Sequence, residues 1–148
     1  MILTAQSYHL KSLVELGQEY YASSPYATSH KFEYDTLLDN LRRAMILATH
    51  NIVVAEWDGE VVGGCMAYVA PYSWSSDTLG NVELIYVKPQ HRGSGHAEAM
   101  LDHQESWANS IGAREIVGGD IGFNPTAMKD WLESQGYHDS GVVIRKVL

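Results

Sequence analysis

Apolar residues recur at helical spacing in two early segments, which predicts two helices near the N-terminus. The first stripe runs from Leu10 to Gly17, with Ser7 as a plausible cap, and the Ser-Ser-Pro segment at 23–25 should end it. The second helix is expected to begin near residues 32–35. Its apolar stripe consists of Leu37, Leu38, Leu41 and Met45.

Runs of strand-forming residues predict a sheet. Residues 51–57 and 61–69 flank Asp58-Gly59, a dipeptide typical of a tight turn between antiparallel strands, so we expect a hairpin there. A polar loop at 71–80 leads into the next strand. Further strands are expected at residues 2–4, 82–87, 115–119 and 142–147.

The second half of the chain carries the signals of two more helices. An apolar stripe from Ala97 to Ile111 is followed by Gly112, a residue typical of helix C-termini. The last helix should begin at Asn124-Pro125 and end at Gly136, with an apolar face of Ala127, Met128, Trp131 and Leu132. Because strands and helices follow one another without an internal repeat, we expect one α/β domain over residues 1–148.

The composition suits a single globular domain. The chain has 148 residues, of which 45% are hydrophobic and 19% charged, and this length is typical of one domain with a real core. No apolar run approaches a membrane span, and the N-terminus lacks the pattern of a signal peptide. We therefore expect a cytoplasmic protein that does not associate with a membrane.

The formal net charge of −8 argues against nucleic acid as a partner, because phosphate binding requires clustered Lys and Arg. It suits a cationic substrate, and it equally suits simple solubility. The single cysteine, Cys65, lies in an apolar run, which predicts a buried, inert thiol rather than a nucleophile. The seven histidines show no metal-ligand spacing, so no metal is expected.

The junction between the strand at 82–87 and the following helix carries the strongest chemical signal. Arg92-Gly93-Ser94-Gly95 forms a glycine-rich loop directly before the helix. The first backbone N–H groups of a helix lack internal acceptors and carry the positive end of its dipole, which favours a phosphate. A dinucleotide fingerprint is excluded because Glu98 replaces its third glycine, and the Lys-Ser/Thr pair of a P-loop is absent. An ordinary strand-to-helix turn is the alternative.

This stretch resembles the signature of the GNAT N-acetyltransferases, Arg/Gln-x-x-Gly-x-Gly/Ala. Arg92, Gly95 and Ala97 occupy its three defined positions, and Val87 and Pro89 match the residues that precede it. The predicted order of elements is also that of the GNAT fold, so the resemblance covers nearly the whole chain. It implies an α/β fold with a single mixed central sheet of about 6–7 strands, flanked by about 4 helices.

The resemblance implies that the chain binds acetyl-CoA as acyl donor, with its pyrophosphate on backbone N–H groups of the loop. The positions to which it gives this role are Tyr86, Val87, Arg92, Gly93, Ser94, Gly95, His96 and Ala97. Asn124, followed by Ala127 and Gly136-Tyr137, is similar to the second CoA-side motif of the family. His91, His96 and His103 are expected to face solvent or lie near CoA.

One position departs from the family pattern. The tyrosine that usually protonates the leaving thiolate is replaced by Leu132. A CoA thiol has an unperturbed pKa of roughly 8.5, like that of cysteine, and leaves readily as thiolate. The general acid is therefore unassigned. The departure also supports an alternative, in which the chain is a catalytically weak GNAT-fold module that binds acyl-CoA or a protein.

Acetyl transfer to an amine requires a group that accepts the proton of the amine. Glu83 is the first candidate because it shares a strand face with Val87, and a solvated or acceptor-orienting carboxylate is the alternative. Asp120, at the exit of the strand at 115–119, is the second, with helix capping or turn formation as the alternative. The resemblance implies that a backbone N–H near a strand bulge around Tyr86-Val87 binds the oxyanion.

The aromatic link between the first two helices is expected to lie over the acceptor site. Tyr26 and Tyr34, together with Glu83, are the candidate substrate contacts, and ordinary packing is the alternative for each tyrosine. The expected partners are acetyl-CoA and a primary amine, either a small cationic amine or a protein amine. A homodimer is compatible with this picture.

Overall fold

The computed structural model describes residues 1–119, 125–141 and 143–148. Its centre is a five-stranded sheet in the order β1-β2-β3-β4-β5, in which β4 and β5 are parallel and the other neighbours antiparallel. The strands are β1 (Ile2–Thr4), β2 (His50–Trp57), β3 (Glu60–Pro71), β4 (Thr78–Val87) and β5 (Ala113–Val117). The mixed α/β sheet is confirmed, with fewer strands than expected. The strand predicted at 142–147 is wrong for residues 143–147, which lie in no strand, and Val142 lies outside the described residues.

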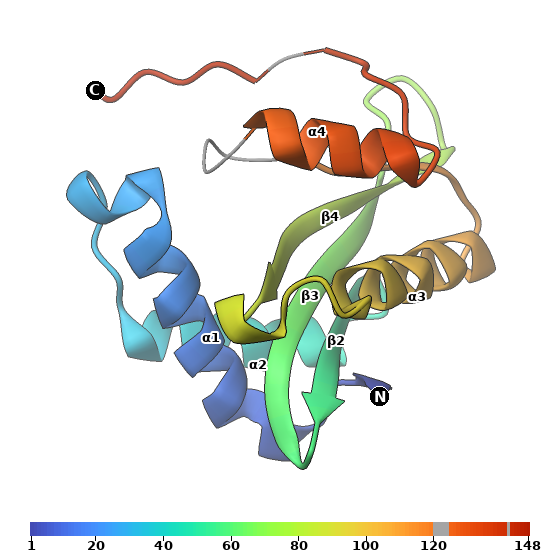
Figure 1. Ribbon diagram of the computed structural model, residues 1–148. Coiled ribbons are helices and arrows are strands. Elements are labelled where there is room, and N and C mark those ends of the chain that lie inside the picture. Colours follow the sequence, from blue (N-terminus) through green and yellow to red (C-terminus); the bar gives the residue numbers. More distant parts are fainter. Residues whose placement is uncertain (120–124, 142) are drawn as a thin grey trace.

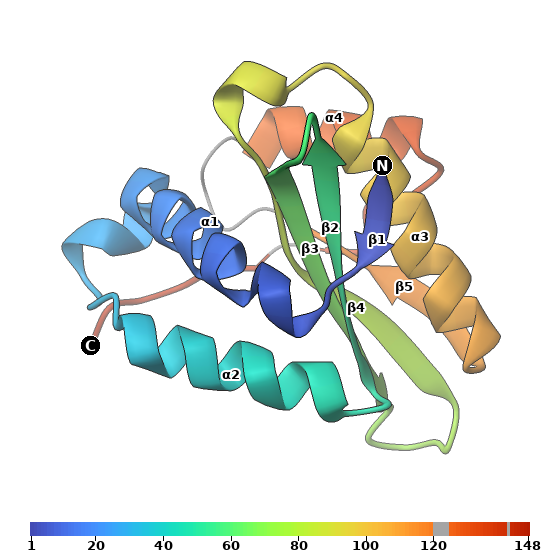
Figure 2. The same ribbon diagram turned by 90° about the horizontal axis from the view of Figure 1, so that it is seen from below.

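Helices cover both faces of the sheet (Figures 1 and 2). Helices α1 (Leu10–Ser23) and α2 (Tyr34–Ile46) pack on one face, and α3 (His96–Ser110) crosses the other. Helix α4 (Pro125–Ser134) is tied to α3, since Trp131 Nε1 donates to Glu98 Oε1 at 3.1 Å. The predicted helices are confirmed, except that the expected cap Asn124 lies outside the described residues and Ala127 is exposed.

The β2–β3 hairpin turns at Asp58-Gly59, as predicted. Both residues have positive φ, 51° at Asp58 and 79° at Gly59, which is the conformation that a two-residue turn between twisted strands requires. The entry to α1 differs from the prediction. A 3₁₀ turn (Ser7–His9) precedes the helix, and the Gln6 N–H donates to Nδ1 of His9 at 2.9 Å, so Ser7 is not the cap. His9 is buried, and its Nε2 lies 3.0 Å from Glu56 Oε1 on β2.

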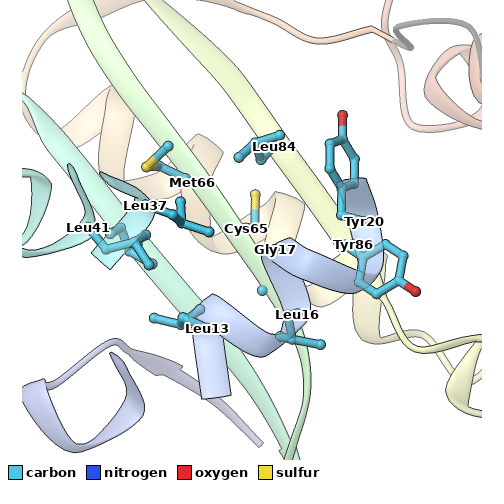
Figure 3. A pocket seen from close by; sticks show the side chains of 12 residues that line it. Leu13, Leu16, Gly17, Tyr20, Leu37, Leu41, Cys65, Met66, Leu84 and Tyr86 are labelled. Carbon is cyan, nitrogen blue, oxygen red and sulfur yellow. The ribbon is translucent and has the colours of Figure 1, made fainter. Parts of the chain in front are cut away.

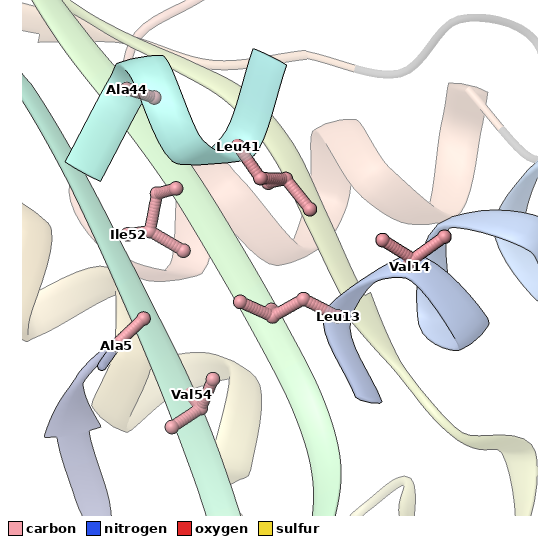
Figure 4. Packing of buried hydrophobic residues seen from close by; sticks show 7 residues of the cluster. All are labelled: Ala5, Leu13, Val14, Leu41, Ala44, Ile52 and Val54. Atoms are coloured by element: carbon pink, nitrogen blue, oxygen red, sulfur yellow. The ribbon is translucent and has the colours of Figure 1, made fainter. Parts of the chain in front are cut away.

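The core has two parts because β2 alternates its side chains between the two faces of the sheet. Ile52 and Val54 point towards α1 and α2, whereas Val53 and Ala55 point towards α3. The first cluster contains Ala5, Leu13, Val14, Leu41, Ala44, Ile52 and Val54 (Figure 4). The second contains Val53, Ala55, Val62, Cys65, Val87 and Met100. Val87 at the end of β4 and Met100 on α3 therefore share one cluster, which holds the start of α3 against the central strand.

A buried amide on α3 adds a polar tie to this apolar contact. Gln104 is fully buried, and its Nε2 donates to the carbonyl oxygens of Asn51 at 3.2 Å and Cys65 at 3.1 Å. Its Oε1 accepts from Asn51 Nδ2 at 3.0 Å. One side chain thus joins α3 to both β2 and β3, and it fixes the position of α3 along the sheet.

We expect Gln104→Leu to lower the free energy of unfolding by roughly 1–3 kcal/mol, the cost of leaving buried polar groups without partners. Leucine fills a similar volume, but it removes the acceptor of Asn51 Nδ2 and one donor to each of two backbone carbonyls. Urea denaturation followed by circular dichroism measures the change. Gln18→Leu on the exposed side of α1 is the matched control and should change stability by less than about 0.5 kcal/mol. Equal denaturation midpoints for the two variants would show that the Gln104 contacts contribute nothing.

Candidate functional site

The strand-to-helix junction is built around two glycines in the left-handed region. β4 ends at Val87, a 3₁₀ turn covers Pro89–His91, and α3 begins at His96. Gly93 has φ 76°, and Gly95, the N-cap of α3, has φ 81°. A Cβ placed at either glycine would meet no atom within 4 Å, so open space borders the backbone at both positions. Glycine is needed here for conformation, and the space leaves the backbone accessible.

The backbone N–H groups of residues 93–98 are available to bind a ligand. Among the described residues, none of these groups makes a well-formed hydrogen bond, and the first N–H of α3 that does so belongs to Ala99, which donates to the Gly95 carbonyl at 3.0 Å. Unpaired amides at a helix start carry the positive end of the helix dipole. The loop predicted from sequence is thus a row of free donors suited to an anion with several oxygens.

Arg92 is held beside this row. Its Nε donates to the carbonyl oxygen of Val87 at 2.9 Å, and its guanidinium carbon lies 5.5 Å from the centre of the Tyr86 ring. These contacts bring together three of the residues predicted to bind CoA, namely Tyr86, Val87 and Arg92. Because Nε donates to the Val87 carbonyl, the positive charge of Arg92 is held at the end of β4, next in sequence to the unpaired amides.

His96 differs from its expected exposure. Its side chain is buried, and its ring packs edge-on against Trp57 of the β2–β3 hairpin, with centroids 6.0 Å apart. The His91 ring lies 6.4 Å away. Of the two alternatives expected for these histidines, exposure to solvent is excluded for His96, because the first turn of α3 packs against the hairpin. Their proximity to CoA stays a prediction.

Glu83 lies at an irregularity of β4. Val82 pairs with Ala67 and Leu84 with Met66, so Glu83 is an extra residue opposite β3. The bulge was expected around Tyr86-Val87, and that position is wrong, because these two residues pair regularly with Gly64 and Gly63. The Glu83 side chain is exposed, and among the described residues it has no hydrogen-bond or ion-pair partner.

The bulge also affects the prediction that Glu83 and Val87 share one face of the strand. Ile85 and Val87 both pack towards α3, as alternation requires, but a bulge interrupts alternation at Glu83 itself. Glu83 is four steps along the chain from Val87, which corresponds to about 13 Å at about 3.3 Å per residue. Glu83 thus lies well back along β4 from the end of the strand that leads to the loop.

Two residues of α1 join the site, and neither was among the candidate site residues from the sequence. The Tyr20 ring meets the Tyr86 ring edge-on at 6.1 Å, and Glu19 Oε2 lies 3.5 Å from the Tyr86 hydroxyl. Partial burial and the nearby Glu19 charge raise the pKa of Tyr86. Glu19 and Tyr86 are 67 residues apart, so only the packing of α1 against β4 brings them together.

An apolar cavity opens next to this pair of tyrosines (Figure 3). It lies between α1, α2 and the sheet and has a volume of about 60 Å³. Its lining consists of Leu13, Leu16, Gly17, Tyr20, Leu37, Leu41, Ile52, Gly64, Cys65, Met66, Leu84 and Tyr86. Cys65 is buried, as predicted, and burial raises the pKa of its thiol to about 12, so the thiol is neutral and unreactive near pH 7.

The candidate substrate contacts Tyr26 and Tyr34 lie apart from this cavity. Tyr34 is the first residue of α2 and is 42% exposed. Tyr26 lies in the link between α1 and α2, and the guanidinium of Arg145 sits 4.3 Å from the centre of its ring. Among the described residues, neither ring contacts Glu83 or the loop at 92–97. The structure therefore does not join these tyrosines to the other candidate residues, and substrate contact stays a prediction.

Comparison with known proteins decides the family. The model of the acetyltransferase (GNAT) family matches residues 11–137, which is most of the chain. The chain belongs to the GNAT family. A curated relative, an amino-acid acetyltransferase from Ralstonia nicotianae, is 26% identical over 102 residues, or 69% of this chain. The chain spans only 21% of the length of that relative.

Solved structures agree on the GNAT fold. AAC(6')-Iy in complex with the bisubstrate analog CoA-S-monomethyl-acetylneamine has a TM-score of 0.81 at 20% identity, covering 99% of this chain and 95% of that one. A transcriptional regulator from Bacillus halodurans C-125 has a TM-score of 0.81 at 16% identity, covering 99% and 97%. At such identities the likeness concerns the fold alone, so the substrate has to be argued from the site.

Leu132, which stands where GNAT proteins usually have a tyrosine, has an apolar environment. Leu132 is buried on the inner side of α4, facing the end of β5 near Gly118. The nearby Tyr137 hydroxyl donates to Glu105 Oε1 at 3.0 Å, and burial together with this contact raises the pKa of Tyr137. Tyr137 is thus engaged with α3. Two further predicted residues, Asp120 and Asn124, lie outside the described residues.

Two findings concern other classes of site. Among residues 1–119, 125–141 and 143–148, no group of three or more His, Cys, Asp or Glu side chains is arranged to hold a metal ion. In the same part of the chain, no helix combines the length and apolar character needed to cross a membrane.

Proposed function

We propose that this GNAT protein transfers the acetyl group of acetyl-CoA to a primary amine by direct attack within a ternary complex. The observation that carries the proposal is the row of unpaired backbone N–H groups at residues 93–98, beside Arg92. This row suits the pyrophosphate of CoA, and family membership makes an acyltransferase the natural setting for it. The fold likeness to AAC(6')-Iy, which was solved with a CoA-based bisubstrate analog, supports the same donor.

At the donor end, the chain supplies position and charge. Gly93, Ser94, Gly95, His96 and Ala97 offer their amides to the phosphate oxygens, and no side chain crowds the two glycines. Arg92 places a fixed cation at the end of β4. Because the amides are already unpaired, binding an anion there breaks no internal hydrogen bond. That preorganisation favours tight binding of the donor.

At the acceptor end, the chemistry requires a general base. A lysine-like amine is neutral in only about 1 molecule in 2500 at pH 7, so a base has to take its proton. We assign this role to Glu83, directly or through a water molecule, because its carboxylate is exposed and has no partner among the described residues. Asp120 is the second candidate. The net charge of −8 favours an acceptor that arrives as a cation, either a small amine or a protein amine.

A second function is favoured by one observation. Leu132 occupies the position of the usual tyrosine acid, and its hydrocarbon side chain has no proton to donate. A GNAT-fold module that binds acyl-CoA or a protein without efficient turnover would need no acid there. Tight acetyl-CoA binding without release of free thiol in the presence of any amine would favour this second function.

Two substitutions at Gly95 test the donor site. Asn and Asp have nearly the same shape, and both tolerate the left-handed conformation and can cap a helix. Only Asp adds a negative charge next to the proposed pyrophosphate. Like charges about 5 Å apart repel by about 3 kcal/mol at an effective dielectric constant of about 20. We expect Gly95→Asp to bind acetyl-CoA roughly a hundredfold more weakly than Gly95→Asn in calorimetry.

The thermal unfolding temperatures of the two Gly95 variants without ligand control for folding and should agree closely. Equal acetyl-CoA affinities for Gly95→Asp and Gly95→Asn would place the phosphates away from the loop. Wild-type protein that binds neither acetyl-CoA nor any other short acyl-CoA would contradict the donor assignment altogether.

Replacing Glu83 by Gln tests the acceptor side. We expect Glu83→Gln to lower kcat by roughly 10²- to 10⁴-fold, the range of a general base, with little change in acetyl-CoA affinity. The pH dependence of the rate should lose the limb that reports the base. Glu60→Gln, an exposed glutamate at the hairpin, is the matched control and should behave as wild type. A pH–rate profile that is the same in wild type and Glu83→Gln would remove Glu83 from the mechanism.

A further inference from the structure

We infer that the apolar cavity under Tyr20 and Tyr86 receives the acyl chain of the donor, and that it accepts chains longer than acetyl. The cavity is the space of about 60 Å³ between α1, α2 and the sheet. The inference rests on the proposed function in one respect, namely that an acyl-CoA binds at the loop of residues 92–97. It adds which acyl groups the protein prefers.

The lining chemistry selects hydrocarbon. No charged side chain lines the cavity, and its polar side-chain atoms are the hydroxyls of Tyr20 and Tyr86. The Cys65 side chain packs on the opposite face of the sheet with Met100, so Cys65 borders the cavity with its backbone. An ammonium group inside the cavity would lose its hydration and meet no carboxylate among the lining residues, which opposes an acceptor amine. The hydrocarbon part of an acyl chain has no hydration to lose, and only its carbonyl group carries a desolvation cost. The cavity therefore suits the acyl chain of the donor.

The position of the cavity matches the path of the donor. β4 leads directly into the free amides, and its side chains alternate. Ile85 and Val87 pack towards α3, while Leu84 and Tyr86 line the cavity on the opposite face. The Tyr86 ring is shared by both regions, because the Arg92 guanidinium lies over it. The same ring forms part of the cavity wall (Figure 3). A donor anchored at the loop and extended along β4 therefore brings its acyl end to this wall.

The size of the cavity sets a chain length. About 60 Å³ is roughly twice the share of one water molecule in the liquid, which leaves room for about two methylene groups. Its inner end is closed by core residues that include Leu41 and Ile52. Apolar cavities of this kind stay dry and take up apolar groups. Propionyl and butyryl chains should therefore be better ligands than acetyl, and much longer chains should be excluded.

Gly64 on β3 keeps the cavity open. A Cβ at this position would lie 3.1 Å from Leu13 Cδ2 and 3.6 Å from Leu16 Cδ1, both of which belong to the lining. The methyl group of Gly64→Ala thus enters the cavity wall. Gly80 on β4 provides a matched control, because its Cβ would meet Ala108 and Ile116 at 3.3 Å, on the α3 face and away from the cavity.

The test is calorimetric titration of wild type, Gly64→Ala and Gly80→Ala with acetyl-, propionyl- and butyryl-CoA. We expect wild-type affinity to rise roughly fourfold for each methylene that enters the cavity, the gain for burying such a group. Gly64→Ala should lose most of the gain for butyryl-CoA while it keeps its affinity for acetyl-CoA. Gly80→Ala should keep the wild-type order. Thermal unfolding checks that both variants are folded. The comparison of the three acyl-CoAs on the wild-type protein tests the inference even if a variant does not fold.

The outcomes separate this inference from the proposed function. Flat or falling wild-type affinity from acetyl to butyryl overturns the inference, even if acetyl transfer to an amine proceeds. A rising series without release of free thiol supports the cavity and contradicts the proposed catalysis. If Gly64→Ala changes kcat/KM for alkyl amines at fixed acetyl-CoA but leaves the acyl-CoA affinities unaltered, the cavity belongs to the acceptor and the inference is wrong.

Discussion

The site depends on one constraint, namely that the backbone amides of residues 93–98 make no well-formed hydrogen bond among the described residues. Buried or crowded amides rarely stay unpaired, so open space beside Gly93 and Gly95 is part of the arrangement. The loop keeps its shape because α3 is held firmly behind it. Met100 packs into the core with Val87, and Gln104 bonds to β2 and β3. Packing of α3 thus holds the unpaired N–H groups of residues 93–98 in place, where an anion can accept their hydrogen bonds.

The candidate site combines features beyond the end of β4 with features along that strand. On the loop side, free amides and Arg92 provide positive potential for phosphate. On the α1 side, an apolar cavity begins at Leu84 and Tyr86. Glu83, at the bulge, is the exposed carboxylate of the same strand. Tyr86 connects these regions, since it contacts Arg92, Tyr20 and Glu19. One strand therefore aligns the phosphate site, the hydrocarbon site and the proton acceptor that we propose.

Local sequence signals predicted much of this fold. Asp58-Gly59 located the hairpin, and Gly112 the end of α3, because turn and cap conformations depend on a few adjacent residues. Long-range packing was not predictable in the same way. At the entry to α1, the side chain that accepts the Gln6 N–H belongs to His9 and not to Ser7, and His9 is held there by its contact with Glu56. The contacts of Tyr86 with α1 likewise join residues that are far apart in sequence. The bulge at Glu83 was misplaced because alternation alone does not reveal an extra residue.

The most direct test of the account is nuclear magnetic resonance of ¹⁵N-labelled protein during titration with acetyl-CoA. The account predicts that the largest changes in amide chemical shift fall on residues 93–98, because their N–H groups gain phosphate acceptors. The amide of Gly112, at the far end of α3, should be nearly unaffected. Saturable binding that leaves the amides at 93–98 unchanged would contradict the central claim.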